Sequence, residues 1–281
     1  MIRRGALRML GLVLACAVLS ACSTGWFDDD DEVVVEERSA QEIFEDAEAL
    51  LEDNNPQAAA QTYDELERLY PFSQLAKRAT IMSAYSSYEA GNMPAARASA
   101  GRYLDLYPSD PDAAYAQYLI ALTYYDTIVD VERDQATTKN ALQELTEVTL
   151  RYPTSDYARD AQLKIDLTNN HLAGKEMTVG RYYLKRGHYI AAVNRFRVVL
   201  EQYQTTAHTP EALHRLVEAY LSLGLEDEAV TTAAVLGENF VGSEWYAASF
   251  ALLTDRDLRP EREPGGFFSD IYRRVFQGKW L

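Results

Sequence analysis

The feature that most constrains the fold of this chain is a short phrase that returns along the sequence. An aromatic residue and a helix breaker are followed within a few positions by small residues, as in YPFSQLAKRA from Tyr70. The phrase returns as YPSDPDAAYA from Tyr107, as YPTSDYARDA from Tyr152 and, more loosely, as YQTTAHTPEA from Tyr203. Proline disfavours helical backbone in the residue before it. Each copy therefore predicts a joint at which one helix ends and the next begins.

A second pattern lies just before each joint and is typical of a helix that packs in a hairpin. Five alanines follow short turns, namely Ala59, Ala96, Ala141, Ala192 and Ala229. Four residues later come Tyr63, Ala100, Leu145, Phe196 and Ala233, and seven residues later come Leu66, Tyr103, Val148, Val199 and Leu236. Residues at these spacings share one helix face, and alanine lets two helices approach closely. The pattern resembles the second helix of a tetratricopeptide repeat.

The spacing of the repeats places their insertions. The alanines stand 37, 45, 51 and 37 residues apart, whereas a repeat of this type has about 34 residues. In the third repeat the charged segment 128–135 lengthens the turn within the hairpin. In the fourth, residues 156–185 contain no proline, which predicts one long first helix. No segment alternates with a period of two. We therefore expect an all-α, right-handed superhelix of five tetratricopeptide-type hairpins over residues 39–241.

The first 21 residues predict a signal peptide. Arg3, Arg4 and Arg8 precede an apolar stretch, residues 9–18, that is too short to span a bilayer. The segment LSAC that follows resembles the lipobox of bacterial lipoproteins. That resemblance implies that Cys22 becomes the first mature residue and carries N-acyl and S-diacylglycerol groups. Ser23 after it implies sorting to the outer membrane.

Residues 22–38 read as a lipidated acidic tether. The run from Asp28 to Glu32 consists of five like charges, which repel one another and favour an extended chain. The whole chain has a formal net charge of -16, and an acidic surface repels phosphate. Nucleic acid is therefore not an expected partner.

Residues 242–281 depart from the repeat and read as a C-terminal extension. After a break at REPGG, the segment FFSDIYRRVFQ predicts an amphipathic helix with Arg273 and Arg274 opposite one apolar stripe, formed by Phe267, Phe268, Ile271, Tyr272, Val275 and Phe276. One interpretation is a cap over the last hydrophobic face of the array, since such arrays need one. The other is docking to a partner or to lipid.

The sequence offers little chemistry for catalysis or metal binding. Its four histidines form no close pair, and it has no phosphate-binding loop and no nucleophile elbow. Cys16 is predicted to leave with the signal peptide, and Cys22 is predicted to be acylated, so no thiol would remain. We expect no enzyme, no metal and no cofactor beyond the lipid on Cys22.

A binding surface is the function that remains. First helices line the concave face of tetratricopeptide superhelices, and several of the 19 tyrosines fall on predicted first helices. We expect Tyr85 and Tyr88 to form apolar platforms for an extended peptide, and Lys77 or Arg78 to hold its terminal carboxylate. The alternative is that these tyrosines pack between helices and that the two cations are solvated.

The lipobox, the acidic tether and the repeats together resemble the BamD family of outer-membrane assembly lipoproteins, over roughly residues 19–240. The most specific segment is GRYYLKRGHYIAAVNRF, residues 180–196, in which the matching positions are Tyr182, Tyr183, Arg186, Gly187, Val193, Asn194 and Arg195. The resemblance implies a scaffold without catalytic activity on the periplasmic face of the outer membrane.

The same resemblance implies partners. The carboxy-terminal repeats would dock the POTRA domains of a BamA-type barrel protein, with Arg195 in the family's ion-pairing position and Asn194 and Arg186 beside it. Accessory Bam lipoproteins would join the complex, and the amino-terminal repeats would receive unfolded outer-membrane proteins.

A periplasmic repeat protein of the Tol-Pal cell-division system is the alternative. That family also writes YPxSxYA, but it usually has a cleaved signal and an amino-terminal coiled coil. Residues 22–39 show no heptads, which argues against it.

Overall fold

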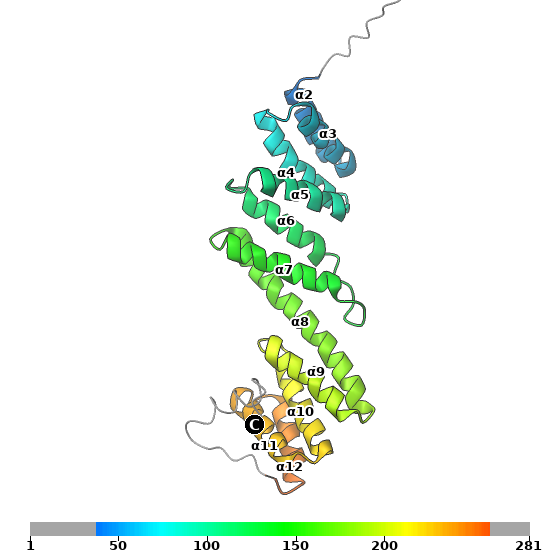
Figure 1. The fold of residues 1–281 in the computed structure, drawn as a ribbon, viewed down its shortest axis with the longest axis vertical. Helices are drawn as coiled ribbons and strands as arrows, with labels where there is room; N and C mark the ends of the chain where they lie inside the picture. The colour runs from blue at the N-terminus through cyan, green and yellow to red at the C-terminus, as the bar shows by residue number, and fades with distance from the viewer. Residues whose placement is uncertain (1–37, 259–281) are drawn as a thin grey trace, which may run out of the picture. The chain divides into compact units, whose positions relative to one another are not determined.

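The computed structural model describes residues 38–258, and every regular element in that range is an α-helix (Figure 1). The helices are α2 (Ala40–Glu52), α3 (Pro56–Leu69), α4 (Gln74–Glu89), α5 (Met93–Leu106), α6 (Ala113–Tyr125), α7 (Ala136–Arg151), α8 (Asp156–Lys185), α9 (Tyr189–Gln202), α10 (Thr209–Leu223), α11 (Glu226–Asn239) and α12 (Glu244–Thr254). The predicted signal peptide, Cys22, nearly all of the acidic tether and the apolar stripe of the tail lie outside the described residues.

The helices pack in chain order as hairpins. Each first helix contacts its own second helix, in the pairs α2–α3, α4–α5, α6–α7, α8–α9 and α10–α11 (Figure 1). Each first helix also contacts the next first helix along the chain, from α2 through α4, α6, α8 and α10 to α12. The first helices therefore form one continuous inner row, as in a tetratricopeptide array. The predicted all-α fold is confirmed.

The joints between hairpins share one backbone geometry. The second helix ends at an aromatic residue whose φ lies between -129° and -139°, and whose N–H still donates to the carbonyl four residues earlier; these residues are Tyr70, Tyr107, Tyr152, Tyr203 and Phe240. In three joints the serine three positions later caps the next helix, as Ser155 Oγ does by accepting from the Ala158 N–H at 3.1 Å. The aromatic ends one helix while the polar residue starts the next.

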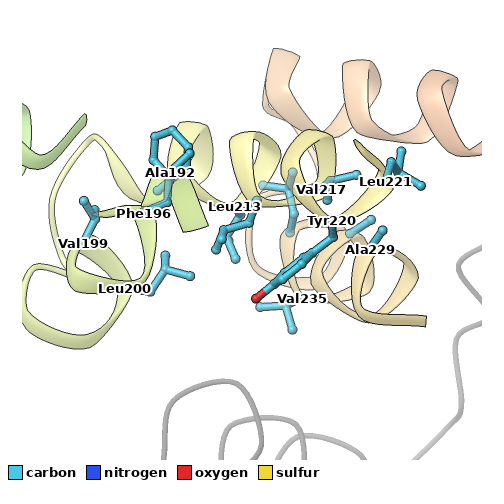
Figure 2. Packing of buried hydrophobic residues seen from close by; sticks show 14 of the residues in the cluster. Ala192, Phe196, Val199, Leu200, Leu213, Val217, Tyr220, Leu221, Ala229 and Val235 are labelled. Atoms are coloured by element: carbon cyan, nitrogen blue, oxygen red, sulfur yellow. The ribbon is translucent and has the colours of Figure 1, made fainter. Parts of the chain in front are cut away.

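The core follows the alanine pattern. The fifteen side chains predicted at the alanine positions and four and seven residues beyond them are all at most 1% exposed. In the fourth and fifth hairpins they merge into the largest cluster, where side chains of α9, α10 and α11 converge (Figure 2). A fully buried aliphatic or aromatic side chain stabilises a fold by about 1.5–3 kcal/mol. The sequence pattern therefore marks the residues that hold each hairpin together.

The two predicted insertions lie where the spacing placed them. Residues 126–135 connect α6 and α7, and Gln135 closes this loop by donating from Nε2 to the carbonyls of Asp130 and Arg133, at 3.2 and 3.1 Å. Helix α8 runs for 30 residues without a break. Its carboxy-terminal half meets α9 so closely that a Cβ on Gly180 would lie 2.4 Å from Cε1 of Phe196.

Helix α12 was not foreseen. Its joint, FVGS from Phe240, has neither the tyrosine that begins the other four joints nor the proline that follows it in three of them, yet Phe240 has the same backbone geometry and Ser243 caps the helix. Helix α12 is tied to α10 by a contact of 2.8 Å between His214 Nδ1 and Ser249 Oγ, both buried. It therefore continues the row of first helices past the five hairpins.

The close contact between α8 and α9 yields a prediction about glycine. Gly180→Ala should destabilise the fold by about 1–3 kcal/mol, because the added methyl would overlap the fully buried ring of Phe196. The matched control is Gly101→Ala in α5, where no atom lies within 4 Å of an added Cβ and where alanine should stabilise the helix by up to about 1 kcal/mol. Urea unfolding followed by circular dichroism measures both. Equal effects at the two positions would contradict the packing described here.

Candidate functional site

The predicted peptide groove falls on α4, the first helix of the second hairpin. Lys77 Nζ lies 2.5 Å from Oδ2 of Asp110, which belongs to the following joint. Asp110 also accepts from the Tyr103 hydroxyl at 2.7 Å and from the Asp112 N–H at 3.0 Å. The hydrogen bond from Lys77 is the main reason that the pKa of Asp110 falls to about 2. Lys77 therefore ties α4 to the third hairpin and already has a carboxylate partner.

Arg78 contacts the preceding first helix, whereas Lys77 contacts the joint that follows its hairpin. Its Nη2 lies 3.2 Å from Oε1 of Glu48 on α2, and its guanidinium lies 4.9 Å from the ring centroid of Phe44. The side chain of Arg78 is 61% exposed and that of Glu48 is 43% exposed. An ion pair this open contributes at most about 1 kcal/mol. A ligand carboxylate can therefore compete with Glu48 for Arg78 at little cost.

Both tyrosines of the groove are half-buried. Tyr85 and Tyr88 pack against the cluster between α4 and α6. The Tyr88 hydroxyl donates to the carboxylate of Asp126 at the end of α6, and burial together with this hydrogen bond raises the pKa of Tyr88. Both rings are therefore partly packed between helices, as the alternative interpretation predicts, and partly exposed to solvent.

The next step of the inner row repeats the arrangement around Tyr118, one of the tyrosines that fall on predicted first helices, with partners that the sequence pattern did not indicate. Tyr118 on α6 stacks on Tyr157 of α8 at 5.3 Å between ring centroids, and its hydroxyl donates to Asp160. Burial is the main cause that raises the pKa of Tyr118 to about 12. Lys164 pairs with Asp160 at 2.7 Å and lies 5.9 Å from the centroid of the Tyr118 ring.

Aspartates in or beside the following first helix accept from side chains of the preceding one along this row. Asp110 receives Lys77 of α4, Asp126 receives Tyr88 of α4, and Asp160 receives the hydroxyl of a tyrosine on α6. Each pair is 33 to 42 residues apart in sequence, about one repeat. The sequence signal for these contacts is the spacing itself, since each tyrosine or lysine lies about one repeat length before its aspartate.

The predicted partner-binding residues lie on the fourth hairpin. Arg195 Nη1 on α9 lies 3.1 Å from Glu176 Oε2 on α8, and the Arg195 side chain is 45% exposed. Asn194 is exposed and lines a shallow depression with Tyr183, Gly187, His188, Tyr189, Ile190, Ala191 and Leu223. Ile190 is 69% exposed.

Arg186 lies at the turn of the same hairpin. Its guanidinium lies 4.7 Å from the ring centroid of Tyr182, which is 52% exposed. The structure thus places Arg186 and Asn194 close to the hairpin turn, while Arg195 faces Glu176 and lies outside the residues that line the depression. The three belong to one hairpin but not to one pocket.

The described residues offer no metal-binding centre. Within residues 38–258, no three histidine, cysteine or acidic side chains come together as a metal site, and no helix has the length and apolarity to cross a membrane. His214 and Ser249 form a close pair that is buried between α10 and α12, where burial lowers the pKa of His214. This contact holds the two helices together.

Comparison with known proteins adds a family to this geometry. Residues 36–236 match the model of the YfiO family, described as outer membrane lipoprotein. Outer membrane protein assembly factor BamD of Caulobacter vibrioides is 48% identical over 229 residues, 82% of this chain and 75% of that protein. BamD of Rickettsia prowazekii is 41% identical over 75% of this chain and 84% of its own length. BamD of Neisseria meningitidis is 33% identical over 79% of this chain and 87% of its own length.

The family match runs from before α2 into α11, and together with these relatives it confirms the resemblance seen in the sequence. This chain belongs to the YfiO family of outer membrane lipoproteins, alongside the BamD assembly factors.

Proposed function

We propose that this chain is a scaffold of the outer-membrane barrel assembly machinery, which docks the POTRA domains of a BamA-type barrel protein and receives unfolded outer-membrane proteins. Three relatives that are 33–48% identical over most of the chain are named outer membrane protein assembly factors. The array of hairpins supports a binding role, because stacked repeats present long continuous surfaces to partners. Accessory Bam lipoproteins are further partners of the same scaffold.

The proposed location is the periplasmic face of the outer membrane, with Cys22 as the lipid anchor. The support is the lipobox in the sequence, LSAC ending at Cys22, together with the family description. Each buried methylene of an acyl chain stabilises membrane binding by about 0.8 kcal/mol, so several chains on one cysteine give a stable anchor.

The docking proposal rests on the surface of the fourth hairpin. It combines the exposed side chains of Tyr182 and Ile190 with the cations of Arg186 and Arg195. Aromatic residues and arginine are enriched among the residues that dominate binding energy at protein interfaces. A guanidinium can grip a carboxylate with two hydrogen bonds, and Arg195 would do so by exchanging its half-exposed contact with Glu176 for an acid of the partner.

The inner face of α4 carries the substrate proposal. Barrel strands alternate apolar and polar residues, so an extended barrel segment presents a row of apolar side chains. The open edges of Tyr85 and Tyr88 can receive such side chains, and Arg78, the more exposed of the two cations, can receive a terminal carboxylate. Lys77 is the weaker candidate because Asp110 holds it at 2.5 Å.

Replacing Arg195 tests the docking proposal. Arg195→Leu should reduce co-purification of the barrel protein at least about tenfold, because losing one partner of a desolvated pair costs on the order of 2–5 kcal/mol. The helical circular dichroism should not change, since Arg195 is exposed.

Two further variants sharpen this test. Arg159→Leu removes an arginine of α8 that is 83% exposed and should leave co-purification intact. Glu176→Gln releases Arg195 from its partner and should preserve or strengthen docking. Unchanged co-purification of Arg195→Leu, or an equal loss in Arg159→Leu, would remove Arg195 from the interface.

Photo-crosslinking tests the substrate proposal. A photoreactive residue at position 78, 85 or 88 should crosslink to a synthetic peptide that carries the carboxy-terminal segment of a barrel protein. Crosslinking at position 85 should fall severalfold in an Arg78→Gln background, because the terminal carboxylate loses its cation. Position 77 is expected to crosslink less, since its side chain is engaged by Asp110.

The peptide controls separate recognition of a signal from general stickiness. A scrambled peptide and one with an amidated carboxy terminus should crosslink weakly. Equal labelling by all three peptides, or labelling only from the fourth and fifth hairpins, would place substrate recognition elsewhere.

A further inference from the structure

Helix α12 occupies the place of a first helix in a sixth hairpin. It follows a joint with the same backbone geometry as the other joints, and it contacts both α10 and α11, but it packs mainly on α10, whereas α4 packs mainly on α3, the second helix before it. In Figure 1 it lies at the end of the helical row, beside those two helices. A first helix at this place normally continues into a second one.

The carboxy end of α12 supports the same assignment. In four hairpins the first helix is followed by a residue with positive φ. The residue after it donates its N–H to the carbonyl of the residue five positions before itself. The residues with positive φ are Asn54, Gly91, Gly187 and Gly224. After α12, Asp257 has a φ of 59° and the Leu258 N–H donates to the Leu253 carbonyl at 2.9 Å. In the four hairpins the second helix begins one residue after the donor of this hydrogen bond. Because α12 ends in the same turn, the chain leaves α12 as it leaves the first helix of a hairpin.

Helix α12 is open at positions that are buried by later helices of the array in the other hairpins. The residues seven positions before the turn are buried in the other four hairpins, namely Ala47, Ala84, Gly180 and Val217, and so are the residues ten positions before it, Phe44, Ile81, Met177 and His214. On α12 these two positions are Phe250, which is 46% exposed, and Ala247, which is also exposed. Later helices of the array cover these positions elsewhere, and no helix covers them within residues 38–258.

The sequence after Leu258 carries a start signal typical of a second helix and then a helix breaker. Pro260 stands where Pro94 stands in α5, at the second position of the helix. Pro264, Gly265 and Gly266 then break any helix after about one turn. The next apolar periodicity is the stripe of residues 267–276, which contains four aromatic rings.

We propose that residues 267–276 pack as a helix on the open face of α12 formed by Ala247 and Phe250, and so supply the missing second helix of a sixth hairpin. Eight residues separate Leu258 from Phe267 and span up to about 28 Å, whereas an eleven-residue helix is about 16 Å long. The segment can therefore reach the whole face. Alanine at positions 247, 248 and 251 leaves room on α12 for the aromatic rings of residues 267–276. Each such ring would bury about 150–250 Å².

Crosslinking from α12 tests this contact in the full-length protein purified in detergent. A photoreactive residue at position 250 should form crosslinks within one chain to residues 267–276, identified by mass spectrometry. The control is the same residue at position 72, where the phenylalanine is fully exposed in the first joint, and it should not label that segment. Crosslinks from position 250 only between two copies, only to detergent or lipid, or to no residue of 267–276, would overturn the proposal.

Hydrogen exchange provides an independent readout. Ile271→Asp with Val275→Asp should expose α12 and speed exchange of its amides by about tenfold, while the amides of α4 stay unchanged. The matched variant Arg273→Ser with Arg274→Ser changes the opposite side of the stripe and should leave α12 protected. Equal exchange of α12 in the two variants would show that the stripe does not cover this helix.

Discussion

The joint between hairpins is the constraint on which the rest of the structure depends. An aromatic residue ends each second helix while keeping its backbone hydrogen bond, and in most joints a polar residue three positions later caps the next first helix. Because the backbone geometry at Tyr70, Tyr107, Tyr152, Tyr203 and Phe240 is nearly the same, each hairpin leaves its neighbour in nearly the same direction. Repetition of this one turn brings the first helices into a row, and the row carries the candidate groove.

Polar contacts along that row link binding to the stiffness of the array. Asp110, Asp126 and Asp160 accept from side chains of the preceding first helices, and Arg181 of α8 pairs with Glu211 of α10 at 2.8 Å. A ligand that draws Arg78 or Tyr88 away from its partner therefore loosens a contact between two hairpins. Each contact is partly exposed, so the exchange is inexpensive. Such a surface suits a carrier that must bind its substrate and release it again.

The repeat pattern predicted the hairpins, the fifteen core positions, the insertion at residues 128–135 and the single long α8, because these depend on contacts between neighbouring segments of the chain. Helix α12 was missed because Phe240 replaces the tyrosine of the other four joints and Val241 replaces the proline that three of them carry. The partners of Lys77, Arg78 and Tyr88 were missed because each lies about one repeat away in sequence, and no local pattern indicates which acid a long side chain will reach. Lipidation at Cys22 and the roles of Arg186, Asn194 and Arg195 stay predictions from the sequence and the family.

Affinity capture of the full-length chain from detergent-solubilised outer membrane tests the central claim most directly. The proposed scaffold should bring down a barrel protein that carries POTRA domains in near-equal amounts, and the captured chain should carry acyl label at Cys22. Wash steps at high salt should weaken but not abolish the complex, since the docking hairpin combines the apolar surface of Tyr182 and Ile190 with charged residues. Recovery of Tol-Pal components without the barrel protein would contradict the account.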